Sequence, residues 1–166
     1  HTLQSTLQTT LNPAVGLPVQ KKITPREKAE VLLKELGVAG TTGYDDILEI
    51  ISYLQAHNKT NSIPSLKTIF TAIAKEHAAE NIQKEAKTIE QRLRRAVFQA
   101  MVSTASMGVV DYTNPKFEES APFYFDYAEV CSLMRTIQQD EKPQISKTHI
   151  NTKKFIQALY TASLEP

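Results

Sequence analysis

A run of long hydrogen-bond donors lies between positions 84 and 95 of this 166-residue chain. Its members are Lys84, Lys87, Gln91, Arg92, Arg94 and Arg95, with only two acids, Glu85 and Glu90, between them. Ammonium and guanidinium groups bind phosphate oxygens, and an arginine fork or a glutamine amide can also pair with the edge of a base. Side chains of these types could therefore hold the phosphates and base edges of a nucleic acid.

The apolar residues of this segment predict a helix that holds the donors on one side. At ~100° per residue, one face of residues 86–101 carries Ile89, Leu93, Ala96, Val97 and Ala100. The opposite face carries Lys84, Lys87, Gln91, Arg94, Arg95 and Phe98. A helix that enters a DNA major groove needs this division between an anchored and a reading face. An ordinary surface helix with a solvated basic face would show the same pattern, so both interpretations stay open at this point.

A shorter apolar-faced helix is expected just before the basic one. Ser65 caps it after Pro64, and its apolar residues are Leu66, Ile69, Phe70, Ile73 and Ala74. A polar stretch over 79–85 separates the two helices, which gives the order helix, turn, basic helix of a helix-turn-helix. Small Ala96 and Ala100 on the inner face would let a supporting helix approach closely.

The remaining pattern predicts an all-α fold of about six helices. They are expected over 24–36, 44–57, 65–78, 86–107, 126–138 and 150–164, with an irregular segment at 109–125 that contains Pro115 and Pro122. Residues 24–166 are expected to form the helical domain. Residues 1–23 are interpreted as a linker or tail, or as the end of an upstream helix marked by Leu3, Leu7 and Leu11.

Catalytic, metal and membrane functions find little support. The four histidines (His1, His57, His77 and His149) lack metal-ligand spacing, and no motif of a catalytic site or cofactor is present. Gly37, Gly40 and Gly43 lack the strand and Lys-Ser/Thr of a phosphate loop. No apolar run approaches the ~20 residues of a membrane span. The single Cys131 cannot form an internal disulfide, which suits a reducing cytoplasm. We expect a cytoplasmic protein without enzyme activity.

Net charge is weak evidence by itself, but its distribution is informative. The chain has a net charge of +1 and a sequence pI of about 8.0, whereas DNA-binding domains often exceed a pI of ~9. Acids gather instead in a second patch, at Asp111, Glu118, Glu119, Asp126 and Glu129. The near-neutral total therefore combines a basic patch with an acidic one.

At the level of these motifs the chain resembles a known family. It is similar to the effector domain of the master sporulation response regulator, and more so to the output domain of YcbB-type glutamine-responsive two-component regulators. The matching residues are Leu36-Gly37-Val38, Gly43-Tyr44, Ile73-Ala74-Lys75, Ile89-Glu90, Leu93-Arg94, Ala96-Val97, Ala100, Asn151-Thr152 and Phe155-Ile156. The resemblance covers residues 26–164.

The resemblance implies a six-helix DNA-binding domain joined to an N-terminal phosphoacceptor receiver that this sequence lacks. It places the DNA-reading positions at Thr88, Glu90, Gln91, Arg94 and Arg95. Three features depart from the sporulation regulator: the segments 78–87 and 109–125 are longer, and Gln91 replaces an arginine. A different operator sequence is therefore expected.

Two hypotheses follow. In the first, the chain binds double-stranded DNA sequence-specifically and activates transcription. Arg94, Arg95 and Gln91 would contact bases, and Thr88 and Glu90 would adjust which bases are preferred. The phosphates would be bound by Lys67, Lys84, Lys87 and Arg92. The resemblance adds genes of glutamine use, a homodimer on DNA and a contact with RNA polymerase. In the second, the chain is a helical protein-interaction domain that does not bind DNA. The aromatic segment 117–127 fits either a partner surface or a loop fixed to the core.

Overall fold

The computed structural model describes residues 22–58, 60 and 62–166, and this part of the chain forms seven α-helices and no strand. The helices are α3 (Pro25–Glu35), α4 (Tyr44–His57), α5 (Leu66–Glu76), α6 (Ile82–Val110), α7 (Pro115–Tyr124), α8 (Tyr127–Gln138) and α9 (Thr152–Leu164). A 3-10 turn lies at Ile145–Lys147. The all-α prediction is confirmed. The helix considered around Leu3, Leu7 and Leu11 lies outside the described residues.

Local capping explains where most of these helices begin. The side chains of Thr24, Ser65, Asn81 and Asn151 each accept a hydrogen bond from a backbone N–H in the first turn of the helix that follows. Such caps satisfy donors that the helix itself leaves unpaired. The cap at Asn81 starts α6 four residues before the predicted start, so residues 82–85 of the expected polar connection 79–85 are helical.

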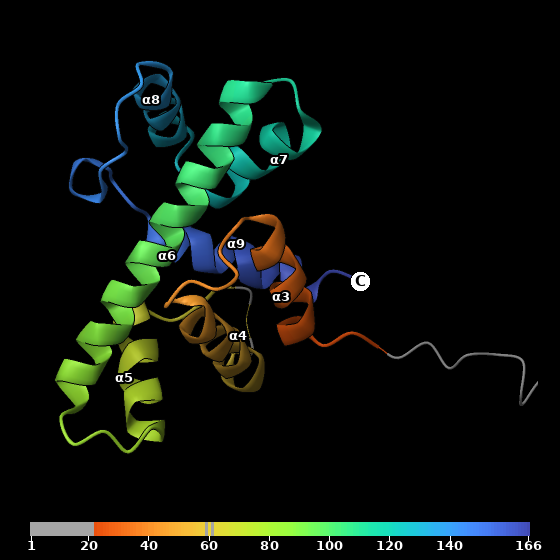
Figure 1. Ribbon diagram of the computed structural model, residues 1–166. Coiled ribbons are helices and arrows are strands. Elements are labelled where there is room, and N and C mark those ends of the chain that lie inside the picture. The colour runs from red at the N-terminus through yellow and green to blue at the C-terminus, as the bar shows by residue number, and fades with distance from the viewer. Residues whose placement is uncertain (1–21, 59, 61) are drawn as a thin grey trace, which may run out of the picture.

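Helix α6 is the spine of the molecule. Figure 1 shows it running diagonally through the fold, with α5 beside its first half and α7 and α8 beside its second half. Helices α4 and α9 also pack against it, and α3 packs on α4 and α9. The core that these helices share includes Leu33, Ile50, Leu93, Phe125 and Phe155, each at most 1% exposed. Five of the other six described helices therefore pack directly against α6, and α3 packs on two of these five.

The prediction of an irregular segment at 109–125 is wrong. α6 continues through Gly108 to Val110, and α7 follows after only four residues. Pro115 occupies the first position of α7, where its missing N–H would have no helical partner, and the Asn114 side chain accepts from the Lys116 N–H. Pro122 lies two residues before the helix ends at Tyr124. The prolines therefore mark the start and the last turn of a short helix.

Gly108 is a close-packing position instead of a helix end. It is buried in α6, and a Cβ atom there would lie 2.7 Å from Cζ of the Phe117 ring. That separation is well inside van der Waals contact. The missing side chain of Gly108 lets α7 lie directly against α6.

Three helices end in the same backbone arrangement, in which the first residue past the cap is left-handed. These residues are Gly37 (φ 77°), Ala78 (φ 51°) and Asp140 (φ 58°). At each, its N–H and the next N–H bond back to carbonyls of the last helical turn. Ala78 ends α5 and so sets the direction of the turn that leads into α6.

No described helix is long and apolar enough to cross a membrane.

Candidate nucleic-acid interface

Helices α5 and α6, joined by the turn at 77–81, form the predicted helix-turn-helix. The inner face of α5 buries Ile69, Phe70, Ile73 and Ala74. The residues predicted for the anchored face of α6 are also buried, and they are Ile89, Leu93, Ala96, Val97 and Ala100. The anchored face of the basic helix is therefore the one that the sequence pattern indicated.

The donor face of α6 is open to solvent. The side chains concerned are Lys84, Lys87, Gln91, Arg94 and Arg95, and all five are exposed. None of them makes a hydrogen bond or ion pair with another residue in the described part of the chain. Because folding leaves these donors unused, they are available to an external acceptor.

Phe98 does not belong to this open face. It is half-buried and packs against the core, contrary to its predicted place among the donors. A phenyl ring at the border of a helix face gains free energy by turning toward apolar neighbours.

Glu90 and Lys67 border a groove beside the donor face. The groove measures about 580 Å³ and lies between the start of α5 and the first half of α6, with Lys67, Lys87 and Glu90 in its lining. Thr88 is half-buried, and its hydroxyl donates to the Lys84 carbonyl at 3.0 Å. Its methyl group and oxygen lone pairs are what Thr88 can still offer to a ligand.

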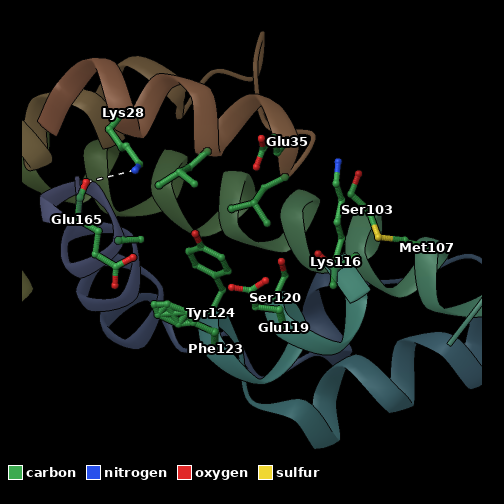
Figure 2. A pocket seen from close by; sticks show the side chains of 14 residues that line it. Lys28, Glu35, Ser103, Met107, Lys116, Glu119, Ser120, Phe123, Tyr124 and Glu165 are labelled. Carbon is green, nitrogen blue, oxygen red and sulfur yellow. Dashed lines mark hydrogen bonds between the residues drawn. The ribbon is translucent and has the colours of Figure 1, made fainter. Parts of the chain in front are cut away.

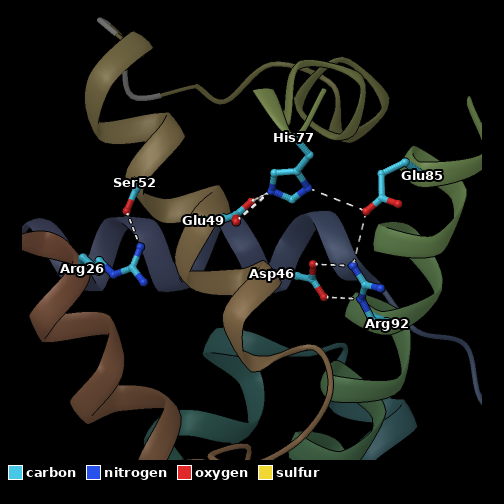
Figure 3. A network of polar contacts seen from close by, with 7 residues as sticks. All are labelled: Arg26, Asp46, Glu49, Ser52, His77, Glu85 and Arg92. Carbon is cyan, nitrogen blue, oxygen red and sulfur yellow. Dashed lines mark hydrogen bonds and ion pairs between the residues drawn. The ribbon is translucent and has the colours of Figure 1, made fainter. Parts of the chain in front are cut away.

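Arg92 points away from the donor face, which differs from its expected contact with phosphate. Its Nε and Nη2 atoms donate to the two carboxylate oxygens of Asp46 at 2.7 and 3.0 Å (Figure 3). The Asp46 side chain is only 8% exposed, and Glu85 lies 3.7 Å from the same guanidinium. The hydrogen bond to Asp46 raises the pKa of Arg92. Arg92 thus fastens α6 to α4.

His77 extends this network across the turn. Figure 3 shows its ring between Glu49 of α4 and Glu85 of α6, with Nε2 at 2.8 and 2.9 Å from the Glu49 oxygens and Nδ1 at 3.7 Å from Glu85. The hydrogen bond to Glu49 is the main cause that raises the pKa of His77. Polar contacts therefore join α4, the turn and α6 at one place.

Close packing brings α4 and α6 together at the same level. A Cβ atom on Gly43 would collide with the backbone carbonyl of Arg92 and lie 2.8 Å from the Ala96 Cβ. Gly43 and Ala96 are therefore small because the start of α4 touches α6 there. This contact brings Asp46 within reach of Arg92.

The sequence interpretation missed this network, although one signal was present. Asp46 shares a helix face with Ile50 and Leu54, which are four and eight residues further on and fully buried. An acid on a buried face needs a cationic partner. The identity of that partner could not be read from spacing, since Arg92 is 46 residues away.

No group of three or more His, Cys, Asp or Glu residues that could hold a metal ion occurs in the described part of the chain.

Comparisons with known proteins agree with one another. Residues 28–159 match the model of the YcbB domain. The chain is also 32% identical over 158 residues to the transcriptional regulatory protein GlnL of Bacillus subtilis (strain 168), an alignment that covers 85% of this chain and 50% of that protein. The chain thus spans about half the length of this relative, and no solved structure matches it. On this match over most of its length, the chain belongs to the YcbB domain family.

Proposed function

We propose that this chain is the sequence-specific DNA-binding domain of a transcription regulator and that α6 enters the major groove. The observation that carries the proposal is the set of five exposed donors without partners on one face of α6. α5 packs behind that helix, as the supporting helix of a helix-turn-helix does. The relative named a transcriptional regulatory protein supports the same role.

Each side chain of the interface has a proposed part. Arg94, Arg95 and Gln91 contact base edges, because these groups can form bidentate hydrogen bonds with guanine and adenine. Thr88 and Glu90 border this set on either side and tune the choice of base. The phosphate contacts come from Lys67, Lys84 and Lys87. Arg92 instead holds α6 in place through Asp46.

The regulatory setting is proposed on the resemblance to the family. Residues 24–166 act as the effector domain, and residues 1–23 act as its linker to a phosphoacceptor receiver domain. Such a receiver would account for part of the half of the relative that the alignment does not cover. The domain binds as a homodimer on repeated half-sites and activates genes of glutamine use.

The test is the affinity of Arg94→Ala and Arg95→Ala for a duplex that the unaltered protein enriches from a random pool. Each variant is expected to bind about 5- to 150-fold more weakly, which corresponds to ~1–3 kcal/mol for a base-reading arginine. Arg135→Ala is the matched control, because Arg135 is exposed on α8 and has no partner in the described chain. Unchanged affinity of both α6 variants, with native circular dichroism, would show that this face does not read DNA.

A second candidate is a protein-interaction surface at the other end of α6. Phe117, Tyr124 and Phe125 are buried, which places most of the aromatic segment in the core. Val110 (87% exposed) and Tyr112 (71% exposed) are open, however, and so favour a contact with RNA polymerase or a second protomer. In transcription assays with purified polymerase, Tyr112→Ser is expected to lower activation while DNA affinity stays unchanged. Full activation by this variant would exclude Tyr112 from such a contact.

A further inference from the structure

A cavity of about 320 Å³ lies between α3, α6, α7 and α9. It borders the second half of α6, at Ser103, Thr104 and Met107, whereas the donor face occupies the first half. Figure 2 shows Tyr124 reaching into its centre, with Lys28 and Glu165 on one side and Glu35, Lys116 and Ser103 on the other. The cavity is therefore separate from the proposed DNA interface.

Two largely buried residues, Tyr124 and Thr104, line this cavity with hydroxyl groups that have no partner in the described chain. Tyr124 is 6% exposed and Thr104 is 3% exposed, and neither side chain forms a hydrogen bond with another described residue. No side-chain nitrogen or oxygen that is completely sealed from solvent lacks a partner in the described chain, so both hydroxyl oxygens remain accessible to solvent. Each hydroxyl is therefore free to form a hydrogen bond with an occupant of the cavity in place of water, and an occupant that offers hydrogen-bond acceptors suits both.

Charges of both signs surround these hydroxyls. Burial is the main cause that raises the pKa of Tyr124 to about 12, and the carboxylates of Glu35, Glu119 and Glu165 add to the effect. Tyr124 is thus a donor at neutral pH. Two ammonium groups, of Lys28 and Lys116, also line the cavity.

Most of these charges are not neutralised within the chain. The side chains of Glu35, Glu119 and Lys116 form no ion pair with another described residue. Lys28 donates to the backbone carbonyl of Glu165 at 3.2 Å. A ligand that carries both an anion and a cation would find a counterpart for each.

We propose that this cavity binds a small zwitterion of the free α-amino acid class. The ligand carboxylate accepts from Tyr124 and Thr104 and faces the Lys116 ammonium, while the ligand ammonium faces Glu35 and Glu119. Leu32, Met107 and Phe123 supply an apolar wall for the ligand side chain. Three carboxylates in the lining disfavour phosphates and other dianions, and a purely apolar ligand would leave both hydroxyls unpaired.

The experiment is a titration of the ¹⁵N-labelled chain with the common L-amino acids, one at a time, up to about 10 mM, where millimolar ligands bind measurably. At least one of them is expected to shift the amide resonances of residues 103–107 and 116–124 saturably. The corresponding N-acetylated amino acid and its methyl ester, which each lack one charge, are expected to bind more weakly.

Two variants that remove only a hydroxyl identify the site. Tyr124→Phe keeps the ring that packs beside Phe125 and Phe155, and Thr104→Val keeps the shape of the side chain. Each is expected to weaken binding about tenfold or more, as the loss of a hydrogen bond to a charged group does. Tyr112→Phe, whose hydroxyl lies outside the cavity, is the control and should bind as the unaltered chain does. The proposal is overturned if no amino acid gives saturable shifts, or if Tyr124→Phe and Thr104→Val both bind the amino acid as tightly as the unaltered chain does. Neither result would bear on DNA binding.

Discussion

Three arginines within four positions of α6 have different surroundings. Arg94 and Arg95 are exposed and unpaired, whereas Arg92 makes a bidentate ion pair with Asp46, whose side chain is 8% exposed. Removing the guanidinium would leave a mostly buried carboxylate without its partner. Arg92 therefore has a structural role, whereas the neighbouring Arg94 and Arg95 are the two arginines proposed to read bases.

We expect Arg92→Ala to lower the free energy of unfolding by about 1–3 kcal/mol, in the range of a hydrogen-bonded charge pair that is partly open to water. The double variant Arg92→Ala with Asp46→Ala should recover part of this loss, because no unpaired charge remains. Urea denaturation of the unaltered protein, the two single variants and the double variant gives the free energy of coupling between the two side chains. If the losses of the two single variants simply add up in the double variant, the ion pair does not stabilise the fold.

For Lys84 we predict the opposite of Arg92, namely an effect on DNA binding and none on stability. It is exposed and unpaired, so Lys84→Ala should leave the free energy of unfolding nearly unchanged. Because a phosphate contact releases counterions, the variant should lower the slope of log affinity against log salt by about 0.9. Anisotropy titrations at several salt concentrations measure this slope. A slope equal to that of the unaltered protein would remove Lys84 from the phosphate contacts.

His77 should make stability depend on pH. Its pKa is raised, chiefly by the hydrogen bond to Glu49, so the folded protein holds this proton more tightly than the unfolded chain does. The contribution is fully present below the ordinary histidine pKa of about 6.5 and is lost as pH rises through the folded value. In thermal melts across this window, the melting temperature should fall as pH rises in the unaltered protein and in His149→Gln. It should fall less in His77→Gln. An identical decline in His77→Gln would assign the effect to other groups.

At the level of single residues, the sequence separated the two faces of α6 but not the roles of its cations. Ile89 and Leu93 are buried and Arg94 and Arg95 exposed, because helical periodicity alone determines these positions. Arg92 lies at the border between the faces, and its orientation depends on Asp46 in another helix. Such long-range pairs leave no signal in local spacing.

Among the elements, the end of α5 contains an avoidable strain. Ala78 has a φ of 51°, a conformation that costs a residue with a Cβ atom ~1–2 kcal/mol and glycine much less. Ala78→Gly should raise the free energy of unfolding by about 0.5–1 kcal/mol after the larger entropy of the unfolded glycine is subtracted. Ala79→Gly, at the next position and without a positive φ, should not stabilise. Chemical denaturation measures the free energy of unfolding of both variants. A lower value for Ala78→Gly than for the unaltered protein would show that the backbone at Ala78 is not strained.

The helices with clear caps and periodic apolar residues were predictable, and α7 was not. The predicted bounds of α4 agree with the structure, and those of α3, α5, α8 and α9 are within two residues. For α7, Pro122 suggested a loop, but packing of Phe117 against Gly108 holds the segment in a helix. Tertiary contacts of this kind override local propensity and are not visible in a window of sequence.

For the whole molecule, the all-α class and the helix-turn-helix order followed from the sequence, while the arrangement around one long helix did not. α6 spans 29 residues and carries the donor face on its first half and the wall of the α3–α6–α7–α9 cavity on its second half. Its length depends on the Asn81 cap and on the small Gly108, which local patterns assigned to a turn and a helix end. One rigid element therefore connects the two candidate sites.

The most direct test of the central claim is to select bound fragments from a random duplex pool near physiological salt and titrate the enriched sequence by anisotropy. A domain that reads bases through α6 should enrich a defined motif and bind it about a thousandfold or more tightly than scrambled DNA. Weak binding without an enriched motif, which disappears as salt rises, would contradict sequence-specific recognition and favour the protein-interaction role.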